Sequence, residues 1–388
     1  MSLLNRRRTI LAKIETTYGT DPIPTGAANA MLVRNLNPVP QNVNLVSRDL
    51  IRPYFGNSDK LPGTLYAGID FEVELAGSGT AGTAPAWGVL MRACGFSETL
   101  NATPITGTAQ AGGSTTTIKL AAGASAVDGF YNGMPITITA GTDIGQSGVI
   151  VGYVGSTKVA TLANPFTTAT DATSAYSIGA CAVYRPISTS FESCTLYFNV
   201  DGVLHELNGS RGTVSFDLNA NAIPIAKFKF IGIYVPVLDS ASPAVTLSAW
   251  MQPLACNKAN TPSFGLYGYN TGTLSQLTLD AGITTVFRQL IGGTQQALIT
   301  DRQAVGQVTI EAVTIATKDW WTAIANATNG TLQITHGTVT GNIVQVSAPK
   351  VQLTSPSYQD LQGVAMLQAS LQLLPSTLGN DELNVAVY

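Results

Sequence analysis

Residues 69–75, IDFEVEL, carry the alternation from which the fold of this chain is predicted. Apolar residues alternate there with three acids, Asp70, Glu72 and Glu74. A period of two with one charged side predicts an antiparallel strand that is half buried, with its apolar side on a core and its acidic side in water.

The next segment, AGSGTAGTAPAWGVLMRACG (76–95), predicts a glycine-rich loop and then a short helix. Thr83 is expected to cap this helix, which ends at Cys94 before a glycine. Its apolar residues recur at the spacing of one helical face, so we expect that face to pack against a sheet. The packing residues are Trp87, Leu90 and Met91.

A similar order of elements recurs near the C-terminus. GQVTIEAVTI (306–315) is a second expected strand, with Glu311 near the place of Glu72. Thr317 is expected to cap a second short helix that carries Trp320 and Trp321, one of which matches the first tryptophan.

Each of these strand and helix pairs is followed by an expected hairpin. The first joins residues 212–218 to 227–235, and the second joins residues 349–355 to 364–375 through a turn at 356–360. Because the same order of elements occurs twice, we predict two tandem units from one duplicated design. Residues 1–103 and 183–255 form the first unit, and residues 256–388 form the second with a C-terminal arm.

Residues 104–182 have no counterpart in the second unit. This block is rich in Gly, Thr and Ala and contains five short strand candidates. Strands at about ten-residue spacing with glycine turns predict a small β-sandwich or barrel inserted at a loop. The expected strands are 115–120, 135–139, 148–153, 158–162 and 175–178.

Composition excludes several classes of protein. Only 11% of the 388 residues are charged, and the net charge of −3 gives no basic surface for gripping nucleic acid. The four cysteines lie far apart without a CxxC spacing, which favours free, mostly buried thiols over disulfides or a zinc site. We expect no secretory signal behind Arg6–Arg8 and no membrane-spanning segment.

Catalytic patterns are also missing from the sequence. His205 and His336 are its only histidines, and neither belongs to a recognisable metal or nucleophile motif. The glycines at 77, 79 and 82 fit GxGxxG, but an acidic strand precedes them and no further βαβ unit follows. We therefore expect a flexible loop, no cofactor and no enzyme.

Four stretches of the chain resemble major tail proteins of siphophages, which form the tail tube. They are ILAKIETTYGTDPIPTGAANAMLV (10–33), VSRDLIRPYFGN (46–57), FEVELAGSGTAGTAPAWGVLMRACGF (71–96) and GNDELNVAVY (379–388). The resemblance implies β-sandwich units with a flanking helix that contribute strands to a β-barrel shared between subunits. It also implies rings stacked into a tube, and the apparent duplication favours trimeric rings with pseudo-sixfold symmetry over hexamers.

The resemblance further implies a set of partners and a location. Copies of the chain are the main partners, with the tape measure protein and then double-stranded DNA in the lumen. Tail terminator and distal tail proteins are expected at the tube ends, without a membrane partner. The protein is expected in the virion tail after assembly in the host cytoplasm.

Two sets of residues are assigned to this assembly. Asp70, Glu72, Glu74 and Glu311 are expected to line the lumen, where acids repel DNA phosphates; the alternative is that they are solvated or pair with Arg and Lys. The long loop at 45–63 is expected to contact the neighbouring ring, through charged and aromatic residues suited to an interface. These residues are Arg48, Asp49, Arg52, Tyr54 and Phe55.

Two other classes of function are weighed against this one. A secreted or surface β-domain adhesin would share the Gly- and Thr-rich strands, but no signal for secretion is found. An enzyme would rest on the GxGxxG pattern alone. The size of the purified protein separates these classes, since a tube protein forms rings or filaments.

Overall fold

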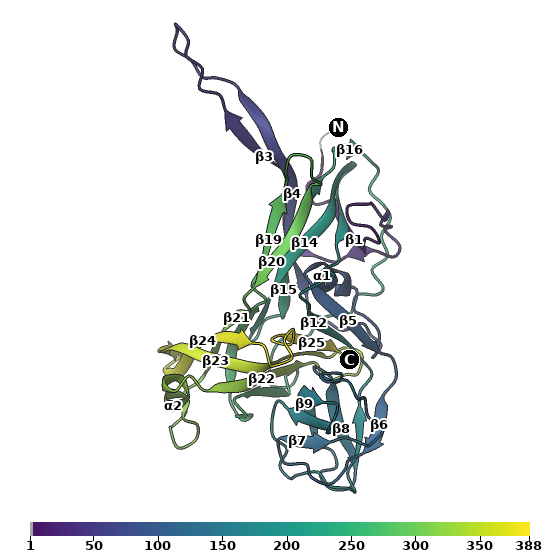
Figure 1. Cartoon of the computed structure of the whole chain (residues 1–388), viewed down its shortest axis with the longest axis vertical. Coiled ribbons are helices and arrows are strands. Elements are labelled where there is room, and N and C mark those ends of the chain that lie inside the picture. Colours follow the sequence, from purple (N-terminus) through teal and green to yellow (C-terminus); the bar gives the residue numbers. More distant parts are fainter. Residues whose placement is uncertain (1–2) are drawn as a thin grey trace.

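The computed structural model describes residues 3–388 and shows an elongated, mainly β protein (Figure 1). A long hairpin projects from one end, and a separate small sheet forms the opposite end. The helices are short: α1 is Gly88–Ala93 and α2 is Trp320–Ala325. Among the described residues, no helix has the length and apolar character that crossing a membrane requires.

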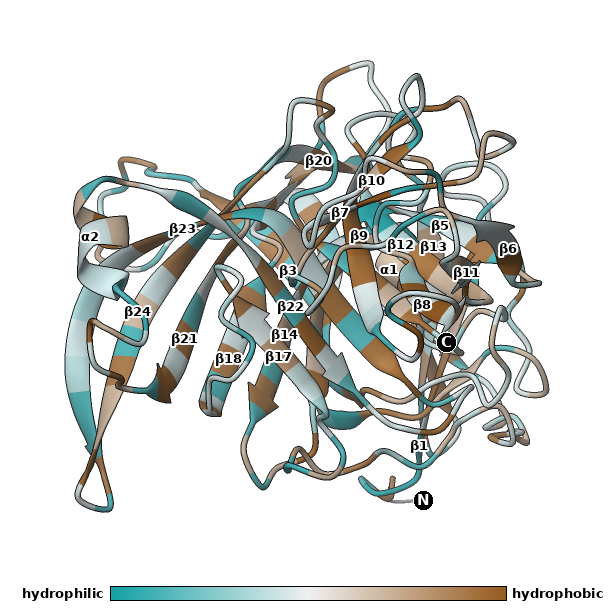
Figure 2. Cartoon of the chain, turned by 90° about the horizontal axis from the view of Figure 1, so that it is seen from below, coloured by the Kyte–Doolittle hydropathy of each residue, from teal (hydrophilic) through white to brown (hydrophobic). Residues whose placement is uncertain are grey.

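The backbone of the molecule is a run of eight strands, each antiparallel to the next. In spatial order they are β3 (Arg34–Ser47), β4 (Lys60–Glu74), β15 (Ile225–Tyr234), β14 (Val203–Asn219), β18 (Leu274–Asp280), β21 (Val305–Glu311), β24 (Val364–Leu374) and β23 (Val344–Leu361). Figure 2 shows β14, β18, β21 and β24 side by side in this order.

The first four and the last four of these strands share one topology. In each group the first two strands along the chain are neighbours, a short helix follows the second, and the last two form a hairpin. The groups meet where Ser215–Asn219 of β14 pairs with Gln276–Asp280 of β18. One continuous sheet therefore runs through both halves of the chain.

Nine further strands complete the large sheet and cover its apolar side. On the β14 side these are β13 (Cys194–Val200), β1 (Arg8–Ile14), β2 (Ala30–Met31) and β16 (Leu238–Asp239). On the β23 side they are β22 (Asn329–His336), β17 (Ser263–Leu266), β25 (Asn384–Val387), β12 (Cys181–Pro186) and β5 (Phe96–Asn101). A single apolar core extends beneath both groups.

Both expected hairpins form, but the second turns later than expected. Strand β23 continues through residues 356–360, with a register shift after Thr354, and turns at Gln362 and Gly363. Both turn residues have positive φ, 56° and 83°, as a two-residue hairpin turn requires. The prediction of a turn at 356–360 was wrong because Pro356 lies on a strand edge, where its missing N–H costs no sheet bond.

Both helices begin later than their expected caps. The Thr83 hydroxyl donates to the carbonyl of Thr80 instead of capping α1, which starts five residues further on. In α2 the cap is Asp319, whose carboxylate accepts the N–H of Thr322 at 2.9 Å, so the prediction of Thr317 was wrong. An aspartate caps a helix as well as a threonine does.

All five strands expected in residues 104–182 are present, in a separate six-stranded sheet. Its spatial order is β6 (Ile105–Thr108), β11 (Ala175–Ile178), β8 (Pro135–Ala140), β9 (Ser147–Val154), β10 (Val159–Leu162) and β7 (Thr117–Lys119). It encloses an apolar cluster of its own, which Ala386 of β25 also joins.

The expected loop at 45–63 is only partly a loop. Strands β3 and β4 remain paired out to Ser47 and Lys60, so the unpaired tip is shorter, from Arg48 to Asp59. Figure 1 shows this hairpin reaching well beyond the body of the protein. Between β18 and β21 a second hairpin, β19 (Ile283–Arg288) with β20 (Gln296–Arg302), lies against β14 and β15.

Candidate assembly surfaces

The eight-stranded run has a polar face opposite the core. Residues that pair directly across antiparallel strands lie on the same face, so the strand register defines rows of neighbouring side chains. One row crosses seven strands: Glu74, Ile225, Asp217, Thr278, Gln307, Ser370 and Thr354. All members of this row except Ile225 are polar, so the face is polar across all seven strands.

The three acids of β4 lie on this face, half-buried, as their alternation predicts. They are balanced by bases of the same chain. Arg34 contacts Glu72 at 3.3 Å and Glu74 at 3.5 Å, and Lys229 lies directly opposite Asp70. The first group of strands therefore carries a mosaic of opposite charges on its polar face.

Two groups on this face have displaced pKa values. Partial burial raises the pKa of the Asp70 carboxyl, and the ammonium of Lys229 partly offsets that rise. A hydrogen bond to Asp217, at 2.6 Å, raises the pKa of Lys227. Lys227 therefore stays charged near neutral pH, beside the carboxylate of Asp217.

The second group of strands presents the same face almost without charge. Its neighbours in the sheet are mainly Gln, Ser and Thr, among them Thr309, Gln368 and Gln372. Glu311 is exposed at the last position of β21. Glu74 is likewise the last residue of β4, so Glu311 occupies the place of Glu74, two residues from the expected one.

The tip of the β3–β4 hairpin carries the loop residues named in the sequence analysis. Arg48 and Asp59 close its base with an ion pair at 3.0 Å, and the Arg52 guanidinium lies 6.0 Å from the ring centre of Tyr54. Ile51 and Phe55 are fully exposed, although they are large and apolar. A projecting pair of such side chains is a typical contact element.

The helix residues divide between core and surface. Trp87, Leu90 and Met91 are buried, and the Trp87 indole donates to the carbonyl of Ala76 at 3.0 Å. Trp320 is 2% exposed, whereas Trp321 is 36% exposed. Trp320 is therefore the counterpart of Trp87.

Trp320 and Trp321 have different neighbours. Trp320 contacts the rings of Tyr267 and Tyr269 edge-on, while Trp321 lies at the surface against Tyr358 of β23. Of the two tryptophans named for helix packing, Trp321 thus contributes to a surface and not to the core.

The glycine-rich loop after β4 has a packing role. The N–H of Gly77 donates to the Asn342 side chain at 2.7 Å, and that of Gly79 donates to the Gly341 carbonyl at 2.8 Å. A Cβ on Gly77 would lie 2.0 Å from the Gly341 oxygen. These glycines let loops from the two halves of the chain touch.

The histidines and cysteines have structural surroundings. His336 is buried, and its ring nitrogens lie 3.0 Å from the Thr261 hydroxyl and from the Leu254 carbonyl. The four cysteines are buried and free, as expected. Within residues 3–388, no cluster of three or more His, Cys, Asp or Glu side chains could hold a metal.

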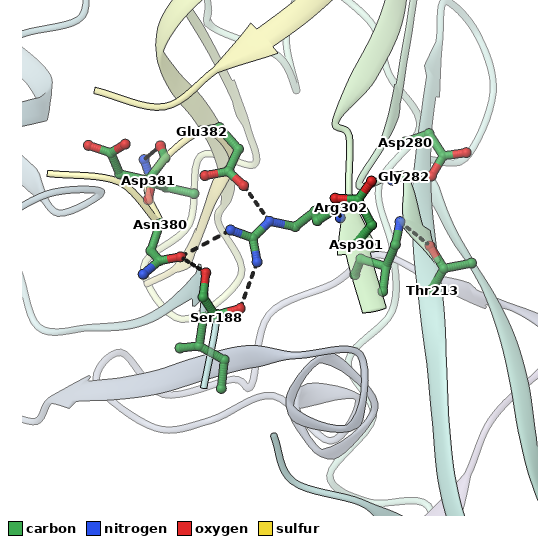
Figure 3. A network of polar contacts seen from close by, with 12 residues as sticks. Ser188, Thr213, Asp280, Gly282, Asp301, Arg302, Asn380, Asp381 and Glu382 are labelled. Atoms are coloured by element: carbon green, nitrogen blue, oxygen red, sulfur yellow. Dashed lines mark hydrogen bonds and ion pairs between the residues drawn. The ribbon is translucent and has the colours of Figure 1, made fainter. Parts of the chain in front are cut away.

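Sequence reasoning missed one partly buried polar network, centred on Arg302 (Figure 3). Its guanidinium donates to Glu382, to the Ile187 carbonyl at 2.7 Å and to Asn380 at 3.1 Å, and Asn380 also accepts from Ser188 at 2.6 Å. A pocket of about 500 Å³ opens beside it. No local pattern reveals such contacts, because the partners are far apart in sequence.

The polar face, the hairpin tip and the surroundings of the histidines described above contain no catalytic constellation. Comparison with curated proteins found no match. The family model described as "Phage tail tube protein" matches residues 5–371, nearly the whole chain. That family is structural and not enzymatic, and its members assemble from copies of themselves in the virion tail. The chain therefore belongs to the phage tail tube protein family.

Proposed function

We propose that three copies of this chain close into a ring with pseudo-sixfold symmetry, and that such rings stack into the tail tube of a siphophage. The lumen conducts double-stranded DNA into the host cell. The observation that carries this proposal is the unbroken eight-stranded sheet, made of two four-stranded groups with the same topology.

The repeated topology supports a duplication of one tube unit. We propose residues 1–103 and 183–255 as the first unit, residues 256–388 as the second, and residues 104–182 as an inserted β-domain. The units are β-sandwich-like, because further strands cover the apolar side of each group. The separate sheet and apolar cluster of residues 105–178 support the inserted domain.

Simple geometry supports the ring. Three copies of an eight-stranded sheet supply 3 × 8 = 24 strands. At a spacing of about 4.8 Å and a tilt near 40°, these strands close into a barrel roughly 50 Å across between backbones. Such a barrel leaves room for a DNA duplex after side chains are placed inside.

We propose that the polar face lines this lumen, with Asp70, Glu72, Glu74 and Glu311 among its residues. Free lysines and arginines would hold DNA by releasing its counterions. The bases of this face are engaged with acids of the same chain, as in the contacts of Arg34 with Glu72 and of Lys227 with Asp217. DNA can then slide past a surface that offers it little net attraction.

We further propose that the hairpin tip contacts the next ring through Arg48, Asp49, Arg52, Tyr54 and Phe55. Its projection and its exposed apolar side chains support this role. The tape measure protein occupies the lumen before DNA does, and terminator and distal tail proteins close the two ends of the tube. Assembly takes place in the host cytoplasm.

Electron microscopy of the purified protein tests the proposal. We expect rings with threefold symmetry and six similar lobes in the wall, and tubes at higher concentration. A stable monomer or a small closed oligomer without a channel would contradict it. That result would favour the alternative, an adhesin-like β protein.

A further inference from the structure

The pairing of strands between the two halves of the chain suggests how strands of two copies can pair. Within one chain, β14 and β18 meet edge to edge, with Asp217 directly opposite Thr278. The pairing continues into the β14–β15 turn, where the Ala220 N–H donates to the carbonyl of Ser275 in β18 at 2.9 Å. On the core side Phe216 and Leu218 are buried against β18.

The two outer strands of the eight-stranded run have unpaired edges. β3 pairs only with β4. β23 pairs with β22 as far as Gln352, and beyond that residue only β24 accompanies it, along one edge. Among the described residues, no strand covers the other edge of β23 between Thr354 and Leu361, nor the outer edge of β3.

These edges run in opposite directions, because seven successive antiparallel pairings separate them. A rotated second copy can therefore place its β3 beside β23 and continue the antiparallel alternation. Exposed edges of this length are aggregation hazards unless a partner covers them. Pro38 and Pro40 in β3 limit the pairing to partners with a matching pattern of hydrogen bonds.

Large apolar side chains are exposed beside these edges, and Tyr358 is exposed where its counterpart Phe216 in the first group is buried. At the end of β23–β24, Tyr358 is 63% exposed, and Leu361 and Val364 are also exposed. A pocket of about 440 Å³ opens beside the start of β3, lined in part by Met31, Leu32 and Leu36. A turn flanked by Leu361 and Val364 and a partly apolar pocket are thus available at the two ends of the sheet.

We propose that the β23–β24 turn of one molecule seats in the pocket beside β3 of the next, and that the β23 edge pairs with β3. The occupant of each edge is a second copy of this chain. This inference rests on the proposed ring and adds the strands and the register that close it.

The register follows from the way the two groups of strands end. β4 ends at Glu74 opposite Ile225, and the Leu75 N–H donates to Pro224. β21 ends at Glu311 opposite Met366, and the Ala312 N–H donates to Ala365 in the same way.

With those ends matched, the internal pair Asp217–Thr278 has a counterpart at the edges. Ile225 and Met366 are equivalent, because each lies opposite the last residue of its strand pair, Glu74 or Glu311. Asp217 lies opposite Ile225 and Gln359 lies opposite Met366, so Gln359 occupies the position equivalent to Asp217. Thr278 lies opposite Gln307, which is four residues before Glu311. Asn37 lies opposite Asp70, which is four residues before Glu74, so Asn37 occupies the position equivalent to Thr278. Gln359 of one copy is therefore expected to face Asn37 of the next, with Tyr358 over Pro38.

Cysteine cross-linking tests this register in assembled rings. Asn37→Cys protein is mixed with Ser357→Cys, Gln359→Cys or Leu361→Cys protein and oxidised. We expect a disulfide-linked dimer in highest yield with Gln359→Cys, since facing residues bring their Cβ atoms within about 5.5 Å. The four native cysteines are buried and contribute little background.

The double variant Asn37→Cys/Gln359→Cys should give a ladder of products that stops at the closed ring. A matched control pairs Asn37→Cys with Val286→Cys, an exposed residue of β19 outside both edges, and should give no specific product.

Several outcomes would overturn the inference. Rings seen by electron microscopy without cross-links at any of the three β23 positions would refute this junction while leaving the ring intact. Efficient cross-linking of Asn37→Cys to itself would indicate a twofold contact between β3 strands instead. Protein that never forms rings would refute the proposed function itself.

Discussion

Arg302 and Glu382 form an ion pair in the interior, although 80 positions separate them in the sequence. Their side chains are only 13% and 7% exposed. The pair connects the end of β20 to the C-terminal segment, next to the loop after β12 (Figure 3). It therefore holds together parts of the chain that lie far apart in sequence.

Arg302→Ala should destabilise the protein by about 3–5 kcal/mol, because it leaves the Glu382 carboxylate buried without its cation. Chemical denaturation followed by tryptophan fluorescence measures this change. Arg48→Ala is the matched control: it removes an exposed ion pair at the hairpin tip and should cost less than about 1 kcal/mol. Equal effects of the two variants would show that burial does not decide the strength of these pairs.

The tryptophans at the two short helices provide a second comparison: Trp87 directly precedes α1, and Trp321 lies in α2. Trp87→Ala should lower the free energy of unfolding by about 3–5 kcal/mol, since the side chain is buried and its indole is hydrogen-bonded. Trp321→Ala removes a side chain at the surface and should have a clearly smaller effect. Similar midpoints for both variants in thermal denaturation would contradict the packing described for α1.

The hairpin tip is expected to act between rings and not within them. Replacing residues 49–58 with Asn-Gly keeps β3 and β4 paired and removes Ile51 and Phe55. We expect soluble rings that no longer stack, as seen by electron microscopy. Tubes of normal length from this variant would assign stacking to other surfaces, such as the N-terminal residues or the C-terminal arm.

The thiols should be unreactive in the folded protein. Burial raises the pKa of Cys181 to about 12 and that of Cys256 to about 11, and it also raises the pKa of Cys94 and Cys194. Since the thiolate is the reactive form, a thiol reagent at pH 8 should label none of them quickly. Four equivalents should react after denaturation, and rapid labelling of the native protein would contradict their burial.

Mild acid should weaken the fold through its histidines. Burial lowers the pKa of His336 and of His205, so the unfolded chain binds more protons once the pH falls below about 6.5. Stability is therefore highest above this value, and it should decrease toward pH 5 by at most about 1.4 kcal/mol per pH unit for each histidine. The His336→Gln variant should show a flatter dependence in urea denaturation between pH 7 and pH 5.

Local patterns predicted the elements well and their connections poorly. The alternation of residues 69–75, the helical stripe around Trp87 and the strands of residues 104–182 all depend on neighbours in sequence, and all are present. The bounds of the loop at 45–63 and the caps at Thr83 and Thr317 were wrong. Strand pairing extends into the loop, α1 begins without a side-chain cap, and Asp319 caps α2. An edge strand tolerates proline and polar residues. The composition of residues 45–63 therefore predicts a loop, although the end of β3 lies there.

The candidate surfaces were predicted in part. The acidic side of β4 followed from its period, but the bases opposite it, Lys227 and Lys229, lie more than 150 positions away and become neighbours only through the sheet. The Arg302 network and the contact of Gly77 with Gly341 likewise depend on long-range packing. No pattern within one segment encodes them.

Because β14 is joined to β18 within one polypeptide, the number of strands in the proposed ring is restricted. Each molecule adds eight strands, so a ring cannot gain or lose a single group of four strands. A chain carrying one group alone would be free to close with an odd number of lobes. In the proposed ring, covalent linkage of the two groups thus restricts the number of lobes to even values.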